Sequence, residues 1–217
     1  MPQDWLDVQN DVELPETVYL LCPGPSLADV LDDVDPSRAM VCNYAVTAKL
    51  RKSPRWFFAV DSSIGNAWWW HEAVSRLIAP EAPEFIAGME LYRALPAHHK
   101  NLVRYIVRQG PSLGVEDPYP HLGVVRPNAT VAGSALGALW HHGTMLGRMP
   151  RVLTGGVDLY GGHYFDGTHP YPYQFAAWPQ AIVYRALVDA LAVAGMVVEK
   201  LPVAGCREAG AGSQGVE

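Results

Sequence analysis

The chain has 217 residues, of which 49% are hydrophobic and 18% are charged, so it holds enough apolar side chains for one globular core. Its net charge of -6 disfavours a nucleic-acid binder, a class that usually carries an excess of basic residues. Apolar runs nowhere reach the length of a membrane span, and the acidic segment from Met1 to Asp7 lacks the apolar stretch of a signal peptide, so we expect a cytoplasmic protein.

Predicted strands and helices alternate along residues 17–203, which we expect to form one α/β domain between an irregular lead-in (1–16) and a flexible tail (204–217). Such alternation predicts a Rossmann-like, mostly parallel sheet with helices on both faces. The strands are short and apolar without strict alternation, which is typical of strands buried on both sides. In chain order, we expect strands at residues 17–22, 39–43, 55–60, 84–87, 151–154 and 197–200, and helices at 27–33, 45–52, 68–77, 101–108, 130–146 and 180–194.

Three cysteines, Cys22, Cys42 and Cys206, are an odd number at wide spacing. They do not form the pattern of a disulfide framework, and they fit a reducing compartment. Cys22 and Cys42 each end a predicted strand, so we expect both to be small buried residues.

The most informative segment is the turn Pro23-Gly24-Pro25-Ser26, which separates the first apolar strand from the helix that we expect to follow it. In an open α/β sheet, ligands bind where a strand ends and a helix begins, because the first helical turn has free backbone N–H groups. Gly24 lets a ligand approach the backbone, Pro25 is tolerated at the first helical position, and Ser26 can cap the helix. The turn therefore predicts a phosphate site, with an ordinary strand-to-helix turn as the alternative.

Polar residues also follow three other predicted strands. In a parallel sheet these strand ends share one edge with the turn at Gly24, and such a convergence of small, polar and acidic groups is typical of a nucleotide pocket. Two of these residues have an ordinary interpretation as well, because Asn43 could cap the helix that begins near Ala45, and Asp61 could cap the next one. The residues at the three strand ends are Asn43; Asp61, Ser62 and Ser63; and Asp158 and Tyr160.

A long aromatic loop, residues 161–179, is expected to lie over the carboxyl ends of the strands. It carries His163 and His169, and a histidine there is a candidate general base for an acceptor hydroxyl, because the ordinary pKa of histidine lies near neutral pH. The alternative is that both are surface residues of the loop. His141 and His142, on a predicted helix, are expected to be structural.

The motifs occur in a recognisable order along the chain. Cys22-Pro-Gly-Pro-Ser-Leu27 is followed by Val41-Cys-Asn43, Trp56-Phe-Phe-Ala-Val-Asp61, the pair Gly133-Ser134, and Val152-Leu-Thr-Gly-Gly-Val-Asp-Leu-Tyr160. This series resembles the superfamily that joins Campylobacter-type bacterial sialyltransferases (glycosyltransferase family 42) with the DUF115/MptE-like proteins. The latter group includes 6-hydroxymethylpterin diphosphokinases and motility-associated glycosylation factors.

The sialyltransferase resemblance implies a Rossmann-like fold that binds a CMP-sugar without a metal ion. It places Gly24, Pro25 and Ser26 at the nucleotide phosphates or ribose, and Asn43 at the cytidine or ribose. It assigns two tyrosines, Tyr160 and one near His163 or Tyr164, to the leaving phosphate. We also include in the predicted nucleotide-binding set the strand-end residues Asp61, Ser62 and Asp158, and the pair Gly133 and Ser134 of the motif series.

Two positions depart from the pattern of the sialyltransferases. Pro23 stands where they have an asparagine, which removes one polar ligand. The position of their catalytic histidine falls near Trp178, so that His169 is only its neighbour. The segment with Asp61 looks more like the DUF115/MptE branch, in which an acidic residue could hold a divalent cation.

The sequence therefore predicts a transferase, with a nucleotide-sugar-dependent glycosyltransferase acting on a hydroxyl acceptor as the first hypothesis. Its donor is a CMP- or UDP-sugar, and it requires no cofactor. The main alternative is an MptE-like diphosphokinase or nucleotide-phosphate transferase, in which Asp61 and Asp158 hold Mg²⁺. A phage-type glycosyltransferase acting on DNA bases, a non-catalytic nucleotide-binding protein and a homo-oligomer also remain open. The candidate catalytic residues are His169, His163, Tyr160 and Tyr164.

Overall fold

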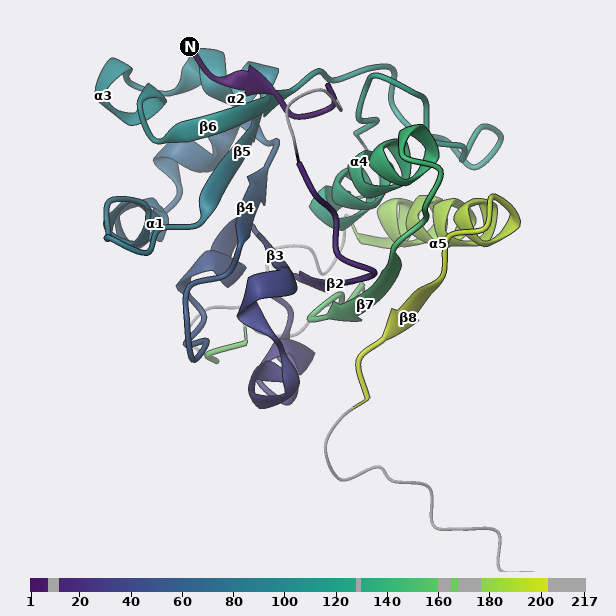
Figure 1. Cartoon of the computed structure of the whole chain (residues 1–217), viewed down its shortest axis with the longest axis horizontal. Coiled ribbons are helices and arrows are strands. Elements are labelled where there is room, and N and C mark those ends of the chain that lie inside the picture. The colour runs from purple at the N-terminus through teal and green to yellow at the C-terminus, as the bar shows by residue number, and fades with distance from the viewer. Residues whose placement is uncertain (8–11, 128–129, 160–164, 168–176, 203–217) are drawn as a thin grey trace, which may run out of the picture.

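The computed structural model describes residues 1–7, 12–127, 130–159, 165–167 and 177–202. These residues form one eight-stranded sheet in which all neighbouring strands run parallel, in the order β1-β6-β5-β4-β3-β2-β7-β8 (Figure 1). The predicted α/β class with a parallel sheet is therefore confirmed. The strands are β1 (Gln3–Asp4), β2 (Thr17–Leu21), β3 (Ala39–Cys42), β4 (Trp56–Ala59), β5 (Glu84–Gly88), β6 (Val103–Val107), β7 (Arg151–Gly155) and β8 (Val198–Lys200).

Helices cover both faces of the sheet (Figure 1). Leu136 of α4 and Leu187 of α5 pack in a core on one face, and Trp70 of α1 and Leu91 of α2 pack in a second core on the other. The α-helices are α1 (Trp70–Leu77), α2 (Met89–Ala94), α3 (Ala97–Lys100), α4 (Thr130–Met145) and α5 (Ala177–Val193). The 3-10 helices are η2 (Pro25–Leu27), η3 (Leu31–Asp33), η4 (Pro36–Arg38), η5 (Asn43–Thr47) and η6 (Ser62–Asn66).

Strand β3 illustrates why the strands show no polar alternation. All four of its residues are buried, and successive side chains enter opposite cores. Met40 and Cys42 face α4 and α5, whereas Ala39 and Val41 face α1 and the 3-10 helices. Because both faces of the sheet are covered, apolar residues are needed at every position of such a strand.

Residues 101–108, predicted as a helix, instead contain strand β6, so this prediction is wrong. Val103, Tyr105 and Val107 are buried, and the residues between them are more exposed, which is the period of a strand. Strand β1 pairs with β6, so part of the predicted irregular lead-in belongs to the sheet. Both strands lie at one edge of the sheet (Figure 1).

The helices expected after the first two strands are short 3-10 helices rather than α-helices. η2 and η3 take the place of the helix predicted at residues 27–33, and η5 takes the place of that at 45–52. Helix α5 begins at Ala177, inside the segment predicted as loop. The other predicted elements agree with the structure to within about two residues, the usual spread in boundary assignment.

Two adjacent histidines of α4 hold the amino-terminal segment against the sheet. His141 Nε2 lies 2.6 Å from the carbonyl oxygen of Leu6, and His142 Nε2 lies within hydrogen-bond distance of the carbonyl oxygen of Trp5. The N–H of Gly123 donates to His141 Nδ1, which leaves Nε2 of that ring as its donor. Both histidines are buried, so their predicted structural role is confirmed.

Candidate functional site

The order of the strands reverses at β2. From β2 the chain proceeds through β3, β4, β5 and β6 on one side, and it then returns to place β7 and β8 on the other side. In open α/β sheets, the crevice at the carboxyl ends of the two strands beside such a switch point is the usual ligand site. Here that crevice lies between the turns that follow β2 and β7.

The two turns are joined through their backbones. The N–H of Cys22 donates to the carbonyl of Gly155 at 2.8 Å, and the N–H of Gly24 donates to the carbonyl of Gly156 at 2.9 Å. Gly156 has φ +69°, and a Cβ there would lie 1.9 Å from the carbonyl oxygen of Cys22. A Cβ on Gly24 would lie 2.5 Å from both the carbonyl oxygen of Gly156 and Oδ2 of Asp158. The close approach of the turns therefore requires glycine at both positions.

Ser26 contacts Asp158 rather than capping a helix. Its N–H donates to Asp158 Oδ2 at 2.8 Å, and its hydroxyl lies 2.8 Å and 2.9 Å from the two carboxylate oxygens. The N-cap of the three-residue helix η2 is Gly24, without a side-chain cap. The predicted cap at Ser26 is therefore wrong. The N–H that was expected to face a phosphate already faces a carboxylate, and a second anion there would be repelled.

Asn43, directly after β3, has an unusual environment. Its φ is +50°, a left-handed conformation that non-glycine residues rarely adopt. Its Oδ1 is buried and has no hydrogen-bond partner in the described part of the chain. The N-cap of η5 is Cys42, so the interpretation of Asn43 as a helix cap is wrong. Strained backbone and an unsatisfied buried acceptor together are typical of a functional residue.

Asp61, after β4, is the N-cap of η6. Its carboxylate accepts hydrogen bonds from the N–H and the hydroxyl of Ser63, both at 2.8 Å, and Ser62 beside it is exposed. The capping interpretation is confirmed for this residue. Three strand spacings, roughly 14 Å, separate the ends of β4 and β7, so Asp61 and Asp158 do not share one ion. No group of three potential metal ligands occurs among the described residues.

Helix α4 brings its amino end to the same edge of the sheet. It ends at Met145 and β7 begins at Arg151, so the carboxyl end of α4 lies beside the amino ends of the strands and its first turn lies beside their carboxyl ends. Thr130, its first residue, has φ +74° and a buried Oγ1 without a partner among the described residues. The sequence correctly predicts that this helix begins at Thr130, but Thr130 is absent from the predicted site residues, because nothing local indicates its positive φ or the burial of its hydroxyl.

The pair Gly133 and Ser134, predicted to bind the nucleotide, lies inside the protein. Both residues are buried, and the hydroxyl of Ser134 lies 3.3 Å from the carbonyl oxygen of Arg126. They form the inner face of α4, one turn after Thr130. Their small side chains let the helix pack closely on the sheet, which is a structural contribution to the site.

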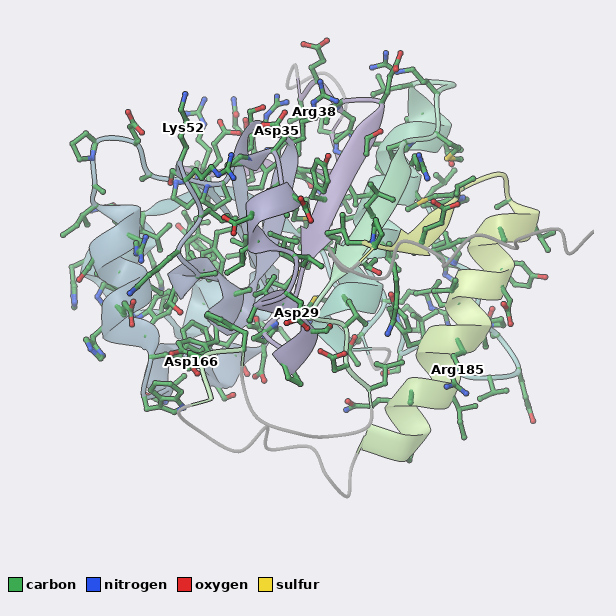
Figure 2. The ribbon with its side chains drawn as sticks, turned by 90° about the horizontal axis from the view of Figure 1, so that it is seen from below. Asp29, Asp35, Arg38, Lys52, Asp166 and Arg185 are labelled. Atoms are coloured by element: carbon green, nitrogen blue, oxygen red, sulfur yellow. The ribbon has the colours of Figure 1, made fainter. Side chains whose placement is uncertain are left out.

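An aromatic group borders the crevice on the η5 side. Tyr44 packs against Trp68 and Phe165, with ring centroids 4.8 Å and 5.4 Å apart, and its hydroxyl donates to Asp166. The N–H of Phe165 donates to the carbonyl of Pro23 at 3.2 Å, so the described stretch 165–167 lies across the turn after β2. Figure 2 shows Asp166 on the opposite side of the view from Arg185 of α5.

Buried thiols and a buried phenol lie beneath the crevice. Burial and the neighbouring Cys22 thiol raise the pKa of Cys42 well above its usual value, and burial raises that of Tyr184. Both cysteines are free and buried, as the sequence predicted. A thiol with a raised pKa is a poor nucleophile, so this group serves as packing beneath the site.

The four candidate catalytic residues, Tyr160, His163, Tyr164 and His169, lie outside the described residues, as does the side chain of Trp178. Cys206 also lies outside them. The roles predicted for these residues therefore remain predictions.

Comparisons of the chain with protein-family models, with curated proteins and with solved structures found no match. Within the described ranges, no helix is both long enough and apolar enough to cross a bilayer. The resemblance noted from short motifs thus stays an expectation, and the arguments below rest on the geometry of the crevice.

Proposed function

We propose that the chain is a nucleotide-sugar-dependent glycosyltransferase whose donor binds beside the switch-point crevice, at the carboxyl edge of the sheet between the end of β3 and the amino end of α4. The observation that carries this proposal is a pair of buried oxygen atoms at that edge, Asn43 Oδ1 and Thr130 Oγ1, neither of which has a hydrogen-bond partner among the described residues. Both belong to residues with positive φ, so the backbone is held in strained conformations at the two positions.

The chemistry of these atoms favours a nucleoside over a bare phosphate. An amide oxygen only accepts hydrogen bonds, so Asn43 Oδ1 requires a donor. A ribose hydroxyl or the exocyclic amine of cytosine supplies such a donor, whereas an unprotonated phosphate does not. Satisfying a buried acceptor of this kind is worth on the order of 1–3 kcal/mol, because its desolvation is otherwise uncompensated.

The amino end of α4 suits the phosphate portion of the donor. Its first turn points backbone N–H groups at the same edge, and the helix dipole adds positive potential there. These groups can stabilise charge on a departing nucleotide without a metal ion. The turn at Ser26 is less suited to the phosphate, because the carboxylate of Asp158 already binds its N–H.

We place the acceptor beside the aromatic group of Tyr44, Trp68 and Phe165. Trp68 is 44% exposed and packs against Tyr44 with the two rings tilted by 58°, and its exposed ring offers an apolar surface for a sugar ring or another acceptor. His163 and His169 are the candidate bases, and Tyr160 and Tyr164 the candidate groups for the leaving phosphate. The diphosphokinase alternative has less support, because Asp61 and Asp158 are separated by three strand spacings.

Titration calorimetry with CMP and UDP, each with EDTA and with Mg²⁺, tests the proposal. We expect binding in EDTA and roughly tenfold weaker binding by Asn43→Ala, the effect of one lost buried hydrogen bond. Asn101→Ala, at an exposed asparagine after α3, is the matched control. Equal affinities of these two variants would contradict the site, and binding of a purine nucleotide only with Mg²⁺ would favour the diphosphokinase.

Transfer itself is tested by release of CMP or UDP from a donor sugar in the presence of a hydroxyl acceptor. His169→Ala and His163→Ala should each be assayed at several pH values, because the loss of a base changes the pH profile of kcat. Release of nucleotide that needs neither histidine would remove both as the base.

A further inference from the structure

Tyr44, the second residue after β3, contacts a segment that lies 122 positions later in the chain. Its hydroxyl donates to Asp166 Oδ2, and its ring packs against that of Phe165 with centroids 5.4 Å apart. The N–H of Phe165 in turn donates to the carbonyl of Pro23, directly after β2. These contacts connect the ends of two neighbouring strands, β2 and β3, through a segment that follows β7.

We infer that Tyr44 and Asp166 are positioning residues of the nucleotide site. They hold Asn43 in its left-handed conformation and thereby keep Asn43 Oδ1 in place for the nucleoside. The inference rests on the proposed function, because the nucleoside is the partner of that oxygen. It assigns contact with the ligand to Asn43, and Tyr44 and Asp166 act through it.

The backbone of Asn43 needs support from both of its neighbours. A non-glycine residue rarely adopts a positive φ, and such a conformation persists only where the surrounding structure enforces it. Before Asn43, the chain is fixed by Cys42, which is fully buried in β3. The next residue is Tyr44, so the contacts of Tyr44 decide whether the chain can relax out of the left-handed conformation.

Tyr44 is fixed at its backbone, at its ring and at its hydroxyl. The hydroxyl of Thr47 donates to the carbonyl of Tyr44 at 2.9 Å, and the rings of Trp68 and Trp69 pack against the Tyr44 ring with centroids 4.8 Å and 5.9 Å away. Packed rings tolerate small shifts, whereas a hydrogen bond weakens steeply when its angle changes. The bond to Asp166 therefore adds a directional restraint to the packing.

The hydrogen bond from Tyr44 to Asp166 is well suited to hold the turn. A hydroxyl that donates to a carboxylate forms a shorter and stronger bond than one between neutral groups. Asp166 is exposed, but Tyr44 is 5% exposed and the bond is partly buried, so water competes less for it. Because Phe165 attaches the same segment to Pro23, the carboxylate is a fixed reference for Tyr44 rather than a group that moves with it.

Titration calorimetry of the full chain with CMP and UDP tests the inference. Tyr44→Phe keeps the ring and removes the hydroxyl, and Asp166→Ala removes the acceptor, so each should weaken binding about fivefold, the effect of one hydrogen bond. Asp166→Asn retains an acceptor oxygen and should bind within about twofold of the wild type. Tyr92→Phe, at a half-buried position of α2, is the matched control and should bind as the wild type does. Unchanged affinity in Tyr44→Phe would overturn the inference.

Two combined variants test whether the pair acts through Asn43. Tyr44→Phe together with Asp166→Ala should bind no more weakly than either single variant, since both remove the same bond. Tyr44→Phe together with Asn43→Ala should bind as weakly as Asn43→Ala alone, because a positioning residue has no effect once the residue that it positions is gone. Losses that multiply in either combination would overturn the inference, since a general structural role of Tyr44 predicts them.

Hydrogen exchange followed by NMR tests the contact without any nucleotide. Loss of the Tyr44 hydroxyl should loosen the segment that carries Asp166, so the amide of Phe165, which donates to Pro23, should exchange severalfold faster in Tyr44→Phe than in the wild type and in Tyr92→Phe. Unchanged exchange would overturn the inference, whatever the nucleotide affinities. Faster exchange in a chain whose wild type binds no nucleotide would uphold the restraint on Tyr44 and refute only the proposed function.

Discussion

Asp158 binds both the backbone N–H and the hydroxyl of Ser26, although 132 positions separate the two residues in the chain. The contact joins the turns that follow β2 and β7, the two strands beside the switch point. It places a carboxylate of the protein where the sequence predicted a phosphate of the ligand. The crevice is therefore bordered on one side by a carboxylate of the protein itself, which would repel a second anion at the turn after β2.

The first prediction concerns the strength of this contact. Asp158→Asn removes the charge that accepts both hydrogen bonds, and we expect the free energy of unfolding to fall by about 1.5–3 kcal/mol. Asp61→Asn is the matched control, because Asp61 makes the same pair of contacts to Ser63 at an exposed position. We expect a loss below about 1 kcal/mol there. Urea unfolding at pH 7 measures both, and equal losses would contradict the importance of the contact between the turns.

The second prediction concerns the close approach of the two turns. Gly156 and Gly147 both have positive φ, but a Cβ on Gly156 would overlap the carbonyl of Cys22, whereas one on Gly147 would meet nothing within 4 Å. We expect Gly147→Ala to lower the free energy of unfolding by about 1 kcal/mol and Gly156→Ala by more than about 4 kcal/mol. Urea unfolding of the two variants checks this, and similar values would show that the turns can separate without cost.

The positions of the strand ends could be predicted from the sequence, because buried parallel strands consist of short apolar runs that end at polar or glycine-rich turns. The run before Pro23 and the run before Asp61 are of this kind. The partners of the polar residues could not be predicted, because they depend on strand order. Nothing local at Ser26 indicates that the carboxylate facing it belongs to a residue after β7.

The error at β6 has a local cause. Arg104 and Arg108 are spaced by four residues, a spacing that is compatible with one face of a helix. The residues between them are Tyr105, Ile106 and Val107, which prefer strands. Pairing with β1 then fixes this segment at the edge of the sheet, and that partner lies about 100 residues earlier in the chain.

The third prediction concerns acid stability. His142 Nδ1 is buried without a partner among the described residues, and burial lowers the pKa of this histidine below its usual value of 6.5. The folded ring therefore stays neutral at a pH at which the unfolded ring gains a proton. It follows that the free energy of unfolding decreases as the pH falls below about 6.5, because proton uptake favours the unfolded state.

His142→Gln removes this titration but keeps a side-chain N–H near the carbonyl of Trp5. We expect it to reduce the pH dependence of unfolding between pH 7 and pH 5, measured by urea titration at each pH. His71→Gln, at an exposed position of α1, is the control. Its free energy of unfolding should change with pH as that of the wild type does. If the free energy of unfolding of His142→Gln depends on pH as strongly as that of the wild type, other groups cause the acid sensitivity.

The fourth prediction concerns Arg126, which organises the loop between β6 and α4. Its guanidinium is 5% exposed, donates to the carbonyls of four loop residues and forms an ion pair with Asp117 at 2.8 Å. A lysine ammonium has three donors and no planar fork, so it cannot replace these contacts. We expect Arg126→Lys to lower the free energy of unfolding by about 2–4 kcal/mol. The four carbonyls belong to Pro111, Ser112, Asp117 and Tyr119.

Arg108→Lys is the control for Arg126→Lys, because Arg108 is 69% exposed and, among the described residues, forms an ion pair with Asp4 alone. We expect its effect to stay below about 0.5 kcal/mol. Limited proteolysis gives a second measurement, since cleavage within residues 111–121 should increase only in Arg126→Lys. Resistance equal to that of the wild type would mean that the loop is held by other contacts.

The last prediction separates the fold from the function at Asn43. Its positive φ suits glycine better than any other residue, so Asn43→Gly should leave the free energy of unfolding unchanged or raise it by up to about 1 kcal/mol. Asn43→Ala keeps the strain, loses the amide and should be less stable than Asn43→Gly. If the amide instead serves nucleotide binding, both variants should lose roughly tenfold in affinity for CMP or UDP.

The two measurements on Asn43 thus rank the variants differently. For stability, glycine should equal or exceed asparagine, with alanine lowest, because backbone strain decides the order. For nucleotide affinity, asparagine should exceed both, because only its side chain carries Oδ1. An Asn43→Gly protein that binds nucleotide as tightly as the wild type would show that Asn43 serves the turn alone. If Asn43 is a strained binding residue, Asn43→Gly should be fully stable but should have lost nucleotide affinity. Binding residues are often retained at the expense of stability.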